Sequence, residues 1–446
     1  MGSSAALLLV LFAAIALIVF LIMKVRLHAF LALIVSCMFV GFATGMPLAK
    51  IGASIEAGMA STLGFLATIL GLGTILGKML EVSGGAERLA RTMINALGQK
   101  NAQWAMMIVG FVAGIPVFFQ VGFVLLIPLV FSVAVETGLS LVAIGVPLAV
   151  TLMTVHCIVP PHPAAMAIAL SLKADVGKVI MYGLLVGFPA AALAGPIFIN
   201  LFGGKVDIKP PAHLAKSERT PDAKLPPFGV TLVTILLPLL IMVAKTIIEL
   251  NVPKDAAIMP IISFIGNPIT ALLISVFVAY YTLGFARGFS MSQLTAFTEQ
   301  CFGPVAGILL VIGGGGAFNK VLIDSGLGNE IAKVLTGMQM SPLIMAWIVA
   351  VVMRFAVGSA TVAMMTAAGI IMPVLSAYPG IDPALIAVAI GAGAIGFSHV
   401  NDSGFWIVKE YFGMSLPHMF RTYTLGTTIA AVIGLAGILL IAKVVG

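Results

Sequence analysis

Two stretches of this sequence resemble each other closely enough to indicate an internal repeat. Residues 69–90 read ILGLGTILGKMLEVSGGAERLA, and residues 311–332 read VIGGGGAFNKVLIDSGLGNEIA. Aligned 242 residues apart, the copies share the residues at Gly71, Gly73, Lys78, Leu80, Ser83, Gly84 and Ala90 of the first. Further along, His156 matches His399 at an offset of 243. A two-fold repeat in an apolar chain is typical of secondary transporters.

The chain is too apolar for a globular protein in water. Of its 446 residues, 61% are apolar and only 9% are charged, against roughly a quarter charged in soluble domains. Runs of about 20 apolar residues recur, as helices that cross the hydrocarbon core require. We therefore expect an all-α polytopic membrane protein. The net charge of +7 comes from basic residues scattered between apolar runs, so no nucleic-acid partner is indicated.

The sequence lacks motifs for covalent chemistry and for a resident cofactor. Cys37, Cys157 and Cys301 form no CxxC pair, so we expect buried thiols rather than a disulfide or a metal site. Neither HExxH nor GxSxG occurs, and the glycines at 313–316 are not followed by the Lys-Ser/Thr of a phosphate loop. We expect no enzyme activity and no cofactor, and we assign these glycines to close helix packing or a flexible break.

The repeat divides the chain into two halves joined by a polar linker. We place the first repeat at 1–203, the linker at 204–228 and the second repeat at 229–446. The linker is rich in proline and lysine and is expected to be cytoplasmic. A short amphipathic piece at 51–60 is expected to precede the third span. Apolar runs predict membrane segments at 5–23, 28–46, 61–80, 103–135, 141–155, 178–202, 229–250, 268–285, 303–319, 342–378, 386–399 and 422–445.

Loop charges indicate that the two halves lie inverted in the membrane. In the first half the loops at 24–28 and 81–101 are basic, which predicts that they are cytoplasmic. In the second half the charge pattern reverses. The basic residue Arg287 lies in the loop after the span at 268–285, whereas basic and acidic residues balance in the loop at 320–341. We therefore expect two inverted-topology repeats.

Four interruptions of the apolar runs predict re-entrant hairpins and broken helices. They lie at 114–122, 156–165, 358–368 and 398–404, where glycine, proline or small polar residues cluster. Unwound backbone at membrane depth is tolerated only inside protein or beside a water-filled cavity. Inverted repeats bring such breaks together near the bilayer midplane, so we expect the substrate and coupling-ion sites there.

Arg354 is a candidate for binding an anionic substrate. It lies in the apolar run VVMRFAV without a carboxylate near it in sequence, and an intramembrane arginine is costly unless it is paired or faces a cavity. Its planar guanidinium suits a carboxylate, while Ser359 and Thr361 offer hydroxyls for a polyol. The alternative is a structural arginine bound to backbone carbonyls, with the small residues at 358–361 serving only helix packing.

His156 and His399 occupy equivalent positions in the two repeats, each at the mouth of a break. We expect both to bind substrate or to couple transport to protons, although a buried histidine can also be structural. Asp402 is the carboxylate residue in the break at 398–404, and its protonation would be a route for proton coupling. Its alternative role is to cap the helix that begins after the break.

Three further polar residues complete the expected site. Asn401 would meet substrate hydroxyls, and His162 would orient its proline-rich loop or touch the substrate. Gln120 would be a neutral hydrogen-bonding member of the first hairpin.

At these residues the sequence resembles the gluconate permease (GntP) family of bacterial proton symporters over essentially the whole chain. The resemblance implies import of a sugar acid with a proton across the inner membrane by a multi-pass homodimer. It also implies scaffold and transport domains that move like an elevator, as in the wider ion-transporter superfamily. The segments that carry it are GLGTILGKMLEVSGGAER at 71–88, HCIVPPHPA at 156–164, GGGGAFNKVLIDSG at 313–326, GSATVA at 358–363 and SHVNDSGFW at 398–406.

Two substrates remain open within this family. Residues 266–271 and 156–165 are similar to the D-serine branch, whereas Arg354 and residues 398–402 are similar to the gluconate members, and we favour gluconate. A passive channel or a membrane-embedded enzyme are alternatives of other classes. Family members commonly carry Glu where this chain has Gln120. A neutral amide cannot take up a proton, so either another residue carries the proton or this chain transports poorly.

Overall fold

The protein is a bundle of helices. The computed structural model describes residues 4–117, 119–202, 206–209, 221–253, 255–327, 340–375, 378–400 and 402–445. Every regular element in these ranges is a helix, which confirms the expected all-α class. Seven of the described helices are long and apolar enough to cross a membrane, with an eighth if the bent helix at 119–137 is one span. The chain is therefore a multi-pass membrane protein.

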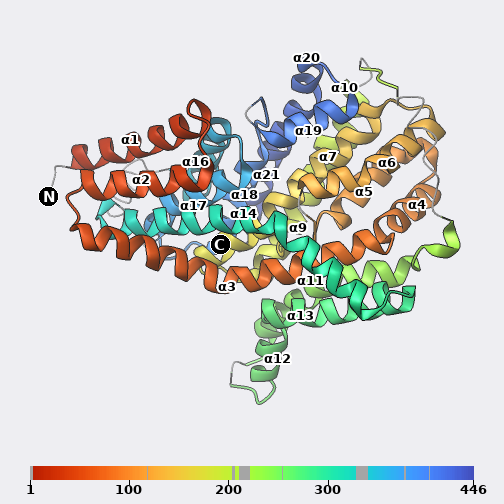
Figure 1. Cartoon of the computed structure of the whole chain (residues 1–446), viewed down its shortest axis with the longest axis horizontal. Helices are drawn as coiled ribbons and strands as arrows, with labels where there is room; N and C mark the ends of the chain where they lie inside the picture. Colours follow the sequence, from red (N-terminus) through yellow and green to blue (C-terminus); the bar gives the residue numbers. More distant parts are fainter. Residues whose placement is uncertain are drawn as a thin grey trace.

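Along the long axis of the molecule the helices form two end groups and a central group. In chain order they are α1 (Ser4–Met23), α2 (Ala29–Ala43), α3 (Leu48–Val82), α4 (Gly85–Leu97), α5 (Ala102–Ala113), α6 (Phe119–Thr137), α7 (Leu141–Ile158), α8 (Pro163–Ser171), α9 (Val176–Ala192), α10 (Phe198–Phe202), α11 (Phe228–Asn251), α12 (Met259–Ile265), α13 (Pro268–Ala279), α14 (Met291–Asp324), α16 (Pro342–Val357), α17 (Ala360–Leu375), α18 (Pro383–Ile395), α19 (Ser403–Phe412), α20 (Leu416–Met419) and α21 (Leu425–Val445). Figure 1 shows α1 and α2 at one end of the long axis, α4, α5 and α6 at the other, and α18 and α21 between them.

The two copies of the repeated segment end two long helices in the same way. α3 ends at Val82 and is followed by Ser83 as its C-cap. α14 ends at Asp324 and is followed by Ser325 as its C-cap. Gly84 and Gly326 come next at φ +74° and +81°, a left-handed backbone that glycine adopts without strain.

α3 and α14 pack closely through glycine. A Cβ atom at Gly58 would lie 2.6 Å from the carbonyl oxygen of Gly316, and a Cβ atom at Gly316 would lie 2.1 Å from Thr62 Oγ1. The glycines at 313–316 lie inside a continuous helix, so close packing rather than a flexible break accounts for them. Both helices are unbroken, so the piece predicted at 51–60 is part of the same helix as the span at 61–80.

α7 and α18 form the centre of the molecule. Every residue of α7 except Ala143 is buried, and every residue of α18 after Pro383 is buried. Helices that are apolar on all sides can be covered by other helices on all sides. A Cβ atom at Gly391 of α18 would lie only 2.3 Å from the carbonyl oxygen of Cys157. This approach holds the end of α7 against α18.

Helices end at each of the four predicted breaks. The first three breaks are shorter than predicted, and the fourth begins two residues earlier than predicted. α6 also bends by 46° between Ile127 and Leu129. Pro163 begins α8, a position where a helix needs no backbone donor. The segments between helices are 114–118 between α5 and α6, 159–162 between α7 and α8, 358–359 between α16 and α17, and 396–402 between α18 and α19.

Candidate functional site

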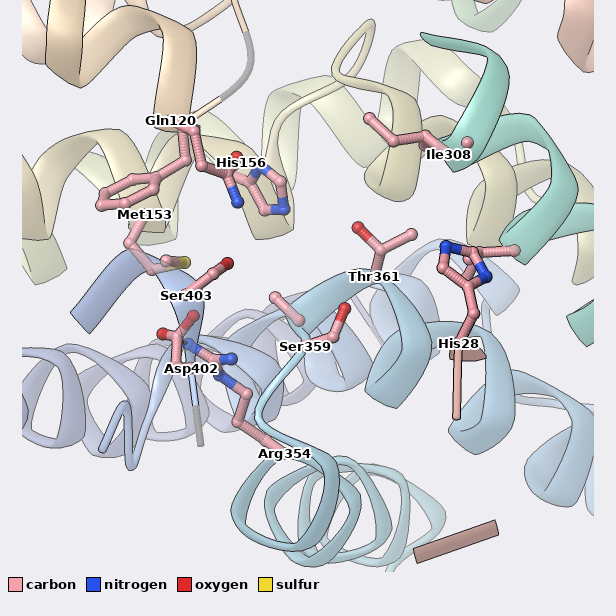
Figure 2. Close-up of a pocket in the computed structure, with 14 residues that line it drawn as sticks. His28, Gln120, Met153, His156, Ile308, Arg354, Ser359, Thr361, Asp402 and Ser403 are labelled. Atoms are coloured by element: carbon pink, nitrogen blue, oxygen red, sulfur yellow. Dashed lines mark hydrogen bonds and ion pairs between the residues drawn. The ribbon is translucent and has the colours of Figure 1, made fainter. Parts of the chain in front are cut away.

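One pocket of about 310 Å³ collects residues at or next to the breaks (Figure 2). Small-molecule pockets are typically roughly 300–1,000 Å³, so this one suits a ligand of a few carbon atoms. Six residues predicted from the sequence line it, namely Gln120, His156, Arg354, Ser359, Thr361 and Asp402. The other lining residues are His28, Phe119, Met153, Gly307, Ile308, Val311, Ala360 and Ser403.

Arg354 and Asp402 form a buried ion pair at the edge of the pocket. Arg354 Nη2 lies 2.5 Å from Asp402 Oδ2, and the side chains are 0% and 5% exposed. The sequence offered no carboxylate near Arg354, and the only alternative to substrate considered there was backbone carbonyls. Its partner is a protein carboxylate 48 residues later, which the fold brings to it.

Asp402 is held in place by the backbone of its own break. Its Oδ1 accepts a hydrogen bond from the Gly404 N–H at 2.8 Å, which makes Asp402 the N-cap of α19. The Ser398 hydroxyl donates to Oδ2, the oxygen that also faces Arg354. Asp402 therefore is both a helix cap and part of the pocket.

Arg354 has donors that the ion pair does not use. Its Nε and Nη1 atoms are buried and have no hydrogen-bond partner among the residues that the structure describes. A buried unpaired guanidinium donor is costly. An oxygen of an incoming carboxylate could accept from either of these donors.

Of the three predicted histidines, only His156 lines the pocket. Its ring centroid lies 4.0 Å from that of His162, which is fully buried outside the lining. His399 is half-buried and outside the lining, with Nε2 2.9 Å from the carbonyl oxygen of Phe355. Asn401 lies outside the described residues.

Hydroxyl and amide groups are among the other residues that line the pocket. Figure 2 shows Ser359, which precedes α17, and Thr361, in the first turn of α17, lying between Asp402 and His28. Gln120 and His156 project from the other side of the cavity. The lining thus has a charged end and a neutral polar end, an arrangement that suits a small hydroxylated carboxylic acid.

Two polar residues of the lining were not predicted. Ser403 follows Asp402 directly and lies inside the predicted break, so a signal for it was present. His28 lies beside a basic turn at the start of α2, and nothing local connects it to a site more than 300 residues away in the chain. Within the described residues no group of three or more His, Cys, Asp or Glu side chains is placed to bind a metal ion.

Comparisons with known proteins identify relatives over nearly the whole chain. The family model described as GntP family permease matches residues 5–445. The D-serine transporter DsdX of Escherichia coli strain CFT073 is 49% identical over 433 residues, with 97% of each chain covered. The gluconate permease of Pseudomonas aeruginosa is 45% identical over 429 residues, covering 96% of this chain and 95% of that protein. The crystal structure of the Alcanivorax borkumensis YdaH transporter is similar in fold, with a TM-score of 0.66 at 14% identity, covering 94% of this chain and 99% of that one.

Proposed function

Because this chain belongs to the GntP family of permeases, we propose that it is a proton-coupled secondary transporter that imports gluconate or a related sugar acid across the bacterial inner membrane. The family makes the chain a transporter and not an enzyme. The observation that carries our proposal is the buried Arg354–Asp402 pair at the end of a pocket lined by hydroxyls.

The charges of the pocket support coupling to a proton. Arg354 and Asp402 neutralise each other in the absence of substrate. A substrate carboxylate that binds Arg354 adds a negative charge, and an uncompensated charge in a buried site is costly. Protonation of Asp402 would restore neutrality and release Arg354 for the substrate. Anion and proton would then bind together, as symport requires.

Hydrogen-bonding groups support a polyhydroxy acid as the substrate. Beyond the ion pair, Ser359, Thr361 and Ser403 present hydroxyls to the cavity, and Gln120 presents an amide. Each of these groups can both donate and accept hydrogen bonds. A sugar acid would satisfy them along its chain while Arg354 holds its carboxylate.

D-serine is the second candidate substrate. Arg354 and Asp402 place opposite charges next to each other, which complements the carboxylate and ammonium groups of an amino acid. The similarity to the D-serine transporter of Escherichia coli points the same way. An amino acid bound to both charges would need no protonation of Asp402.

Uptake into proteoliposomes tests the proposal. With an acidic exterior and an alkaline interior, we expect labelled gluconate to accumulate above its external concentration and a protonophore to abolish this accumulation. Equilibration without accumulation would indicate a passive channel. Competition by an excess of D-serine but not of other aldonates would assign the site to the second candidate.

The two halves support the proposed architecture. We propose inverted repeats at 1–203 and 229–446, a cytoplasmic linker at 204–228, and re-entrant hairpins at α5–α6 and α16–α17. The matching ends of α3 and α14 and the paired breaks after α7 and α18 support it. Elevator-like movement and assembly as a homodimer complete the proposal.

A further inference from the structure

His28 reaches the pocket from a helix that contributes no other lining residue. It is the N-cap of α2, and its Nδ1 accepts a hydrogen bond from the Phe30 N–H at 3.3 Å. The same ring lines the pocket. In Figure 2 it lies across the cavity from Asp402 and Arg354, with Ser359 and Thr361 between.

The capping bond determines which proton His28 carries. A ring nitrogen that accepts a hydrogen bond has no proton, so a neutral imidazole has its proton on Nε2. With Nδ1 occupied by the Phe30 N–H, the polar atom of His28 left for a ligand is the Nε2–H donor.

The two ends of the pocket thus differ in chemistry. Arg354 and Asp402 provide charge at one end. His28 provides a donor at the other, and Ile308 and Val311 of α14 add apolar side chains to the same lining. A carboxylate belongs at the first end, and an uncharged oxygen belongs at the second.

We propose that His28 determines substrate chain length by donating from Nε2 to the terminal hydroxyl of a six-carbon acid whose carboxylate is bound by Arg354. This inference rests on the proposed function. A three-carbon hydroxy acid held at the same carboxylate end has no sixth carbon to carry a hydroxyl to His28. His28 therefore distinguishes gluconate from glycerate, and the carboxylate end does not.

Two substitutions test the roles of the two ring nitrogens of His28 separately. In His28→Asn the side-chain oxygen can take the place of Nδ1, so the cap of α2 is kept and the distal donor is lost. In His28→Gln the side-chain nitrogen can take the place of Nε2, so the donor is kept and the cap is lost. Each full-length variant is purified, and its dissociation constants for gluconate and for glycerate are measured by calorimetry, with melting temperature as the measure of folding.

We expect His28→Asn to weaken gluconate binding about threefold to tenfold, the effect of one neutral hydrogen bond, and to leave glycerate binding and the melting temperature unchanged. His28→Gln should keep the wild-type ratio of the two constants and melt at a lower temperature. Equal weakening of both acids by His28→Asn, or no weakening of gluconate binding, overturns the role of His28. A wild-type protein that binds neither acid overturns the proposed function, and the inference with it.

Discussion

Asp402 combines two roles that the sequence presented as alternatives. It caps α19 through Gly404 and pairs with Arg354 through its other oxygen. A carboxylate has two oxygens that accept hydrogen bonds in different directions, so one residue can do both. The cap fixes the side chain where the charge is needed, and this positioning connects local helix structure to transport.

Replacing Asp402 by asparagine tests its role as the proton carrier. Asparagine still caps a helix, but its amide cannot take up a proton. We expect Asp402→Asn to lose accumulation of gluconate driven by a pH gradient and to retain exchange of labelled for unlabelled gluconate. Exchange needs no net proton movement, and the substrate carboxylate itself would then pair with Arg354.

Ser398→Ala is the matched control for this variant. It removes the Ser398 hydroxyl that donates to Asp402 and leaves both charges in place. This control should remain coupled to the pH gradient. Accumulation by Asp402→Asn that still follows the pH gradient would assign the proton to another residue.

Arg354→Lys tests whether the shape of the guanidinium matters as well as its charge. Lysine can keep the pairing with Asp402 but cannot present two parallel donors to a carboxylate. A hydrogen bond to a charged group contributes about 1.5–3 kcal/mol, so we expect the KM for gluconate to rise roughly tenfold to a hundredfold. The expression level and melting temperature should stay near those of the wild type. An unchanged KM would remove Arg354 from the substrate site.

Among the elements, the crossing of α7 and α18 depends on a residue without a side chain. A Cβ atom at Gly391 would meet the carbonyl oxygen of Cys157 at 2.3 Å, close to where α7 breaks. The carbonyl oxygen belongs to the backbone of α7, and α18 is buried, so neither helix can easily move aside to make room for the added Cβ atom. The position of the break, and so of His156, depends on this contact.

Gly391→Ala is expected to lower stability and transport together. Overpacking in a core costs about 1–3 kcal/mol, so the detergent-solubilised protein should melt several degrees below the wild type. Gly64→Ala is the matched control, because it lies in the interior of α3 with no atom within 4 Å of the added Cβ. Thermal unfolding of both variants measures the difference, and an unchanged melting temperature for Gly391→Ala would contradict the close crossing.

At the scale of the whole molecule, the repeat makes a prediction about the membrane. Glu81 and Ile323 are equivalent positions near the ends of α3 and α14, and both are partly or largely exposed. If the halves are inverted, these positions face opposite sides of the bilayer. A membrane-impermeant thiol reagent applied to intact cells should then label only one of Glu81→Cys and Ile323→Cys, and both after the cells are permeabilised.

The native thiols favour this measurement, since Cys37, Cys157 and Cys301 are buried and should give little background. The wild-type chain, labelled in parallel, is the control. Labelling of both introduced cysteines from the same side of the membrane would contradict the inverted orientation of the two halves. The repeats would then have the same orientation in the membrane.

The class of protein, the internal repeat and the places where helices end could be predicted from the residues alone. These properties depend on local chemistry: apolar runs predict spans, and prolines and glycines such as those at 159–162 and 358–359 interrupt helices wherever they occur. Six of the polar residues singled out from the sequence, at or near those breaks, line one pocket.

The pairing of these residues could not be predicted and depends on how the helices pack. Packing joined Arg354 to Asp402, brought His28 into the lining, and left His162 and His399 outside it. It also made α3 continuous through Ser54, whose hydroxyl donates to Asp324 of α14 at 2.7 Å. The reason is physical: a buried polar group takes whichever partner packing brings within about 3 Å, and separation along the chain does not reveal that partner.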